Sequence, residues 1–159
     1  MRRLFGEDAG EAVALARRAV ELDPRHGANV NTLGNLLRID GQYAEAEKSY
    51  GLAFHLLGSL VPLTNLALNQ YYWHGDRALA TRTLDEVPAA LRLGSYWRSR
   101  QFLLYMLGDF AGSLAAHANG EVAVDFDLRA SLIAALAREK LGDAAGAERN
   151  YRAALLTLE

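Results

Sequence analysis

The sequence predicts an all-α fold in which nine helices stack as antiparallel pairs. Two observations support this prediction. Apolar and small residues recur at helical spacing along the chain, and short glycine-containing turns interrupt them at a nearly constant interval. A single pair of helices cannot bury both of its faces, so several pairs in series are needed to form a continuous core.

The clearest pair lies in residues 30–57, where two amphipathic helices meet at Asp40-Gly41-Gln42. Their apolar stripes contain Leu33, Gly34, Leu37, Tyr43, Ala46, Tyr50 and Ala53. The small residues let the two backbones approach closely, and the leucines and tyrosines fill the space around them. This pair is therefore the unit to look for in the rest of the chain.

The same pattern returns along the chain in register. The turn glycines are Gly41, Gly75, Gly108 and Gly142, spaced by 34, 33 and 34 residues. Each turn is followed by a small residue (Ala46, Ala80, Ser113 and Ala147) and then by a larger one (Tyr50, Leu84, His117 and Tyr151). Upstream, Ala12, Ala16, Ala19 and Pro24 fit the second helix of an earlier unit.

This repeat resembles the tetratricopeptide repeat (TPR), a unit of about 34 residues that forms two helices. The Leu33-Gly34 pair, Trp97 in the tryptophan position and the four turn glycines carry the resemblance, which covers nearly the whole chain. It implies one right-handed superhelical domain. The expected parts are a half repeat at 1–26 and repeats at 27–60, 61–93, 94–126 and 127–159.

Composition excludes several classes of function. The formal net charge of −2 gives no general attraction to nucleic acid, and the chain has no cysteine for disulfide or thiol chemistry. The first ten residues lack the apolar stretch of a signal peptide, and no run of 18 apolar residues is present. We expect a cytoplasmic protein that neither binds nucleic acid nor inserts into a membrane.

The sequence contains no enzyme motif: no phosphate loop, no HExxH, no GxSxG and no cluster of metal-ligating residues. His117 occupies a packing position, and the other three histidines fall near turns, where solvated side chains are expected. Asp125 and Asp127 are interpreted as turn residues. We expect a non-catalytic protein without a cofactor or metal.

Three stretches depart from the regular pattern. The helix expected at residues 7–22 has no partner helix before it. Pro88 should stop one helix near Val87, and Asn119-Gly120 should stop another. Residues 121–127 are expected to form an ordered connection that packs on the helices.

Four asparagines mark a candidate binding face. In the TPR family the first helices of the units line a concave groove that binds extended peptides or partner helices. Asn31 and Asn35 share one helical face there, and Asn65 and Asn69 repeat both positions 34 residues later. An amide both donates and accepts hydrogen bonds, so this ladder suits a peptide backbone of any sequence. The alternative is that asparagine is simply tolerated on an exposed helix.

Aromatic and basic residues complete the expected groove. They are Arg38, Tyr72, Trp73, Arg98, Phe102, Tyr105 and Arg129. Aromatic and arginine side chains dominate binding hot spots, and the arginines favour an acidic or carboxylate-bearing protein ligand. Chaperone-tail-binding TPR proteins grip a terminal carboxylate with lysines as well, and these are absent from the matching positions. Leu132, Ile133 and Leu136 either line the groove or are covered by neighbouring segments.

Two alternatives to peptide binding remain open at this point. The unpaired first helix and the leucines Leu155, Leu156 and Leu158 predict a self-assembling structural module that associates through its ends. The chain is also compatible with the repeat segment of a larger enzyme or regulator, in which catalysis lies elsewhere.

Overall fold

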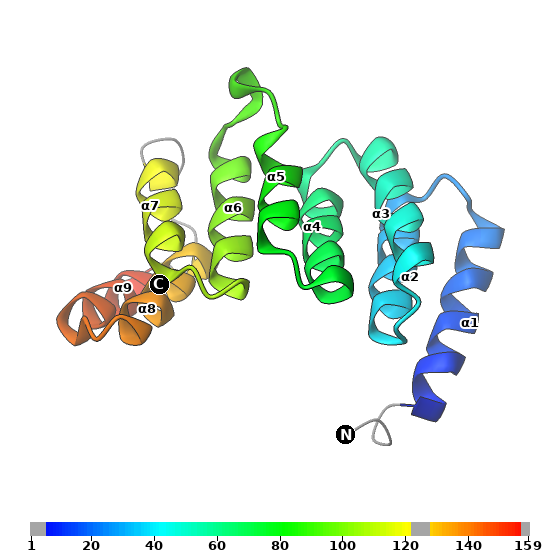
Figure 1. The fold of residues 1–159 in the computed structure, drawn as a ribbon, viewed down its shortest axis with the longest axis horizontal. Helices are drawn as coiled ribbons and strands as arrows, with labels where there is room; N and C mark the ends of the chain where they lie inside the picture. Colours follow the sequence, from blue (N-terminus) through cyan, green and yellow to red (C-terminus); the bar gives the residue numbers. More distant parts are fainter. Residues whose placement is uncertain (1–5, 122–127, 157–159) are drawn as a thin grey trace. The chain divides into compact units, whose positions relative to one another are not determined.

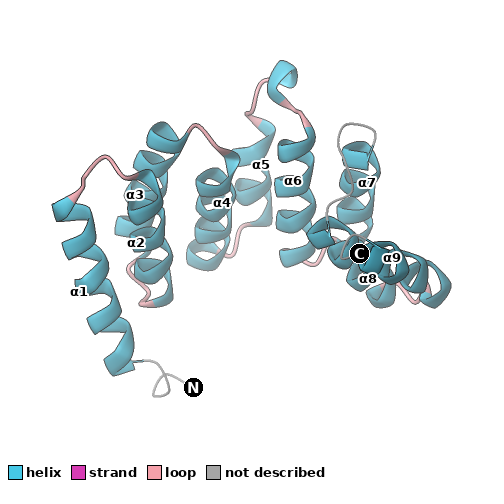
Figure 2. Ribbon diagram, turned by 180° about the vertical axis from the view of Figure 1, so that it is seen from behind, coloured by secondary structure: helices cyan, strands magenta, loops and turns pink. Residues whose placement is uncertain are grey.

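The structure is a computed structural model that describes residues 6–121 and 128–156. Within these ranges it contains nine α-helices, one 3-10 turn and no strand (Figure 2). The predicted all-α fold of helix pairs is confirmed. Packing divides the chain into two compact units, Met1–Thr83 and Leu84–Glu159, and each is described by itself. The repeat boundaries and the single domain expected from the sequence stay predictions.

The first unit consists of four complete helices and the start of a fifth. They are α1 (Gly6–Leu22), α2 (Gly27–Ile39), α3 (Tyr43–Leu57), α4 (Leu60–His74) and α5 (Arg77–Asp85). Helices α1 to α4 lie side by side in chain order, and each packs on the next (Figure 1). The order expected for stacked repeats is therefore present in this unit.

The predicted turn glycines perform the expected role. Gly41, Gly75, Gly108 and Gly142 have φ angles of 81°, 70°, 79° and 80°, in the left-handed region that only glycine adopts without strain. The aspartates that follow three of them start the next helix. Their Oδ1 atoms accept hydrogen bonds from the backbone nitrogens of Leu79 (3.0 Å, Asp76), Gly112 (2.8 Å, Asp109) and Gly146 (2.8 Å, Asp143). The Gly-Asp pair thus ends one helix and caps the next.

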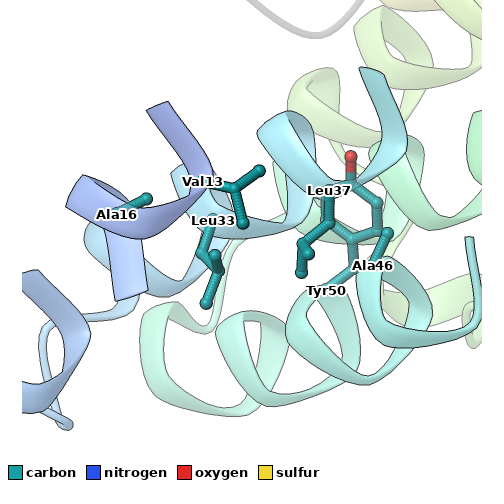
Figure 3. Packing of buried hydrophobic residues seen from close by; sticks show 6 residues of the cluster. All are labelled: Val13, Ala16, Leu33, Leu37, Ala46 and Tyr50. Atoms are coloured by element: carbon teal, nitrogen blue, oxygen red, sulfur yellow. The ribbon is translucent and has the colours of Figure 1, made fainter. Parts of the chain in front are cut away.

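The core of the first unit joins three helices. Val13 and Ala16 of α1, Leu33 and Leu37 of α2, and Ala46 and Tyr50 of α3 form one buried cluster (Figure 3). A Cβ atom at Gly34 would lie 2.7 Å from Cε1 of Tyr50. Only glycine therefore lets α2 approach α3 closely enough to bury the whole tyrosine ring.

The second unit contains the end of α5 and five further elements. They are the 3-10 turn η1 (Ala89–Leu91), α6 (Gly94–Met106), α7 (Phe110–Glu121), α8 (Leu128–Lys140) and α9 (Ala144–Leu156). Tyr96, Leu103 and Leu104 of α6 are buried, as are alanines of α8 and α9. His117 is only 9% exposed, so its predicted packing position is confirmed. His26, His55 and His74 are exposed, also as predicted.

Of the two predicted helix ends, one agrees with the structure and one differs. Helix α5 ends at Asp85, close to the predicted stop near Val87, and Pro88 then precedes η1. Helix α7 runs through Asn119-Gly120, which the sequence predicted as a stop. Asn119 Nδ2 bonds to the Ala115 carbonyl within the helix, and a Cβ atom at Gly120 would lie 3.2 Å from Cβ of Trp97. This glycine therefore serves close packing of α7 on α6.

Several sequence-based expectations lie outside the described residues. They concern the connection at 122–127 with Asp125 and Asp127, and the terminal leucine Leu158.

Candidate functional site

Asn31 and Asn65 form a direct link between two repeats. Nδ2 of Asn65 on α4 donates a hydrogen bond to Oδ1 of Asn31 on α2 at 3.1 Å, and both side chains are half-buried. No other hydrogen bond of these side chains is found among the described residues. The pair therefore retains the Asn31 amino group as a donor and the Asn65 carbonyl as an acceptor, as a peptide group requires.

Asn35 belongs to a different network, centred on the Tyr50 hydroxyl. That hydroxyl donates to Oδ1 of Asn35 at 2.9 Å and accepts from Nε of Arg38 at 3.2 Å. Burial raises the pKa of Tyr50, and the hydrogen bond from Arg38 opposes this rise without cancelling it. The phenol therefore stays protonated at neutral pH and keeps its hydrogen for Asn35.

Asn69 is an interior residue, contrary to its expected place on the groove face. It is fully buried, and its Nδ2 donates to the Tyr43 backbone carbonyl at 3.0 Å, while Oδ1 has no hydrogen-bond partner in the described part of the chain. The exact repeat of Asn35 in the sequence is thus not a repeat in structure. Asn35 meets a tyrosine hydroxyl on α3, whereas Asn69 meets the backbone at the start of that helix.

The end of α4 carries an exposed aromatic cluster. Tyr72 is 45% and Trp73 41% exposed, although both rings are large and apolar. Cζ of Arg38 lies 5.2 Å from the Tyr72 ring centroid, a cation–π distance. The Trp73 ring stacks on Tyr43 at 6.4 Å and on His74 at 4.4 Å. Tyr72 is thus held against α2 and Trp73 against α3.

Tyr43 and Tyr50 are the functional residues that sequence reasoning missed. Both were interpreted only as packing residues of α3. For Tyr50, the signal in the sequence was a tyrosine rather than a phenylalanine at a packing position. A phenolic hydroxyl usually finds a hydrogen-bond partner when its ring is buried. Tyr43 contributes its ring, which stacks on Trp73, and its backbone carbonyl, and neither had a comparable signal.

The remaining predicted residues lie in the second unit, on α6 and at the start of α8. Arg98, Phe102 and Tyr105 are half-buried, and Arg129 is exposed. Tyr105 packs on Phe110 with ring centroids 5.6 Å apart. On α8, Leu132 and Leu136 are each 38% exposed. This unit thus carries its own apolar and basic surface.

Other kinds of site find little support among the described residues. Within residues 6–121 and 128–156, no group of three His, Cys, Asp or Glu side chains is arranged to hold a metal ion. The helices in these ranges are all too short or too polar to span a bilayer.

Comparisons with known proteins identify the fold. No family model and no curated protein matches the chain. Two crystal structures of MamA match with TM-scores of 0.55 and 0.54 at 17% and 18% identity; the matches cover 94% of this chain and 88% and 82% of those chains. The APC/C hetero-tetramer Cut9–Hcn1 matches with a TM-score of 0.62 at 17% identity, over 94% of this chain and 30% of that chain. These are TPR proteins, so the predicted TPR fold is confirmed.

Proposed function

We propose that this chain, which has the TPR fold, is a non-catalytic scaffold that binds an extended segment of a partner protein. The binding surface consists of Asn31, Asn35 and Arg38 on α2 with Asn65, Tyr72 and Trp73 on α4. The observation that carries the proposal is the Asn31–Asn65 hydrogen bond at 3.1 Å, which leaves one donor on α2 and one acceptor on α4, the helix that also carries the exposed rings of Tyr72 and Trp73.

Each group on this surface has a distinct role in the proposal. Asn31 donates to a backbone carbonyl of the bound segment, and Asn65 accepts from a backbone N–H. Tyr72 and Trp73 bury apolar side chains of the partner, and rigid aromatic rings of this kind are typical binding hot spots. Arg38 favours an acidic segment. The surface of the second unit, with Arg98, Phe102, Tyr105 and Arg129, is proposed as an additional contact region.

The fold itself supports a protein partner. The Cut9–Hcn1 structure is a hetero-tetramer, so one protein of this fold assembles with another. A protein or peptide ligand fits this chain better than a small molecule, because an exposed surface of aromatic and amide groups suits a long ligand.

The test is a selection of random twelve-residue peptides displayed on a carrier against the immobilised chain, followed by affinity measurements. Enriched peptides are measured by fluorescence anisotropy with the wild type and with Asn31→Ala/Asn65→Ala. We expect the double variant to bind the enriched peptides at least about tenfold more weakly than the wild type, because two hydrogen bonds to the peptide backbone are lost. Asn29→Ala is the control, since it removes an amide from the same helix without touching the pair. Equal affinity for the double variant and the wild type contradicts the proposal.

Self-association is the second candidate, and exposed leucines favour it. Leu15 and Leu22 on α1 are 66% and 72% exposed, and Leu155 and Leu156 on α9 are 63% and 71% exposed. We propose that these two faces meet between copies of the chain. Sedimentation velocity over a hundredfold concentration range checks this. A sedimentation coefficient that rises with concentration and returns to the monomer value in Leu15→Ser/Leu22→Ser supports it, and a monomer throughout contradicts it.

A further inference from the structure

The network of Asn35, Tyr50 and Arg38 differs in its chemistry from the neighbouring asparagine pair. The Tyr50 hydroxyl has one hydrogen, which it donates to Oδ1 of Asn35 at 2.9 Å, and it accepts Nε–H of Arg38 at 3.2 Å. One lone pair of the Asn35 carbonyl is therefore used, and both hydrogens of its amino group remain. Arg38 has only donors. The network thus presents mainly hydrogen-bond donors.

Arg38 is also held in a fixed orientation. Its Nε is bound to Tyr50, and its guanidinium lies 5.2 Å from the centroid of the Tyr72 ring. These contacts use Nε and one face of the guanidinium group. The two Nη atoms have no hydrogen-bond partner among the described residues. A fork of two N–H donors matches the two oxygens of a carboxylate. No described carboxylate forms an ion pair with Arg38.

The second unit contains another arginine near the end of a helix, Arg138, whose fork is filled. It lies four residues before its turn glycine, Gly142, whereas Arg38 lies three residues before Gly41, so the two do not share a repeat position. Arg138 donates from Nε to Asn150, twelve residues later, just as Arg38 donates to Tyr50 twelve residues later. Nη1 of Arg138 then binds Oδ2 of Asp143 at 2.6 Å. The turn residue that corresponds to Asp143 after Gly41 is the neutral Gln42, whose amide binds Asp40 instead. The carboxylate of Asp143 thus pairs with Arg138, whereas no described carboxylate pairs with Arg38.

We propose that Arg38 and Asn35 form a carboxylate-recognition site for an Asp or Glu side chain of the bound segment, with Tyr50 as the residue that positions both. This inference rests on the proposed function, because it assigns a ligand feature to the same surface. The exposed ring of Tyr72 lies against Arg38, and Trp73 is the next residue on α4. The segment therefore carries an acidic residue close to an aromatic or large aliphatic one.

The composition of the enriched peptides tests the inference. In the selection described above, the carboxyl end of each displayed peptide is joined to its carrier, so only side-chain carboxylates are available. We expect the wild type to enrich Asp or Glu at a fixed spacing from an aromatic or aliphatic residue. Replacing that acid with its amide in a synthetic peptide with a blocked carboxyl end should weaken binding about tenfold.

Three variants assign the effect to this site. With Arg38→Gln the acidic peptide and its amide twin should bind equally. Tyr50→Phe keeps the buried ring but removes the hydroxyl, so it should reduce the preference for the acid while circular dichroism still shows a folded protein. Arg25→Gln removes an exposed arginine outside the surface and should keep the full preference.

The outcomes separate this inference from the proposed function. Enriched peptides without an acid preference, bound more weakly by Asn31→Ala/Asn65→Ala, overturn the carboxylate site and leave peptide binding intact. An acid preference that survives Arg38→Gln also overturns it. Failure to enrich any peptide counts against both.

Discussion

Asn65 donates a hydrogen bond from Nδ2 to Oδ1 of Asn31 at 3.1 Å, joining α4 to α2 across 34 residues of sequence. The bond satisfies one polar group of each amide and leaves one donor and one acceptor. Asn31 and Asn65 are half-buried rather than enclosed, and the proposed function assigns these remaining groups to a ligand. This pair is the structural basis of the proposed binding surface.

Asn69→Ala should lower the free energy of unfolding more than Asn31→Ala does. Asn69→Ala removes a fully buried side chain and its bond to the Tyr43 carbonyl, so it should lower the free energy of unfolding by about 1–2 kcal/mol. Asn31→Ala changes a half-buried group and should lower it by less than about 0.5 kcal/mol. Urea denaturation of both variants checks this. Equal stabilities would show that Asn69 is not an interior residue.

Gly34→Ala should destabilise the first unit. Its Cβ atom would lie 2.7 Å from Cε1 and 2.8 Å from Cδ1 of the buried Tyr50 ring, which has no room to move. Overpacking of this kind costs about 1–3 kcal/mol. The measurement is again the free energy of unfolding in urea.

Gly51→Ala is the matched control for Gly34→Ala. Gly51 also lies within a helix, but a Cβ atom there meets nothing within 4 Å. The alanine should stabilise α3 by about 0.5–1 kcal/mol, because glycine is the poorer helix former. If both alanines stabilise the protein, the close contact between α2 and α3 is wrong.

Asp143 should contribute to the pH dependence of stability. Hydrogen bonds from the Gly146 backbone nitrogen and from the Arg138 side chain lower the pKa of this carboxyl below its ordinary 3.8. A lowered folded-state pKa stabilises the protein above the unfolded-state value, and this contribution disappears as the pH falls through the folded-state pKa. Asp143→Asn should therefore lose less stability than the wild type on acidification below about pH 4. Parallel urea titrations at several pH values measure the difference.

The sequence predicted the backbone of this fold well, because repeated backbone geometry requires particular residues. A left-handed turn requires glycine, as at Gly41 and Gly142, and closely packed helices require small residues, as at Ala46 and Ala147. Side-chain environments were harder to predict. Asn35 and Asn69 occupy the same repeat position, yet their environments differ because one faces a tyrosine hydroxyl and the other a backbone carbonyl. Periodicity indicates which face a residue occupies, and the partner on the next helix decides its role.

The most direct test of the central proposal is nuclear magnetic resonance of the side-chain amides during titration with an enriched peptide. The account predicts that the Nδ2 resonances of Asn31 and Asn65 shift with peptide concentration. The resonance of Asn150, which accepts a hydrogen bond from Arg138 in the second unit, should stay in place. Binding that leaves the Asn31 and Asn65 resonances unchanged would contradict the account, because the peptide would then lie on another surface.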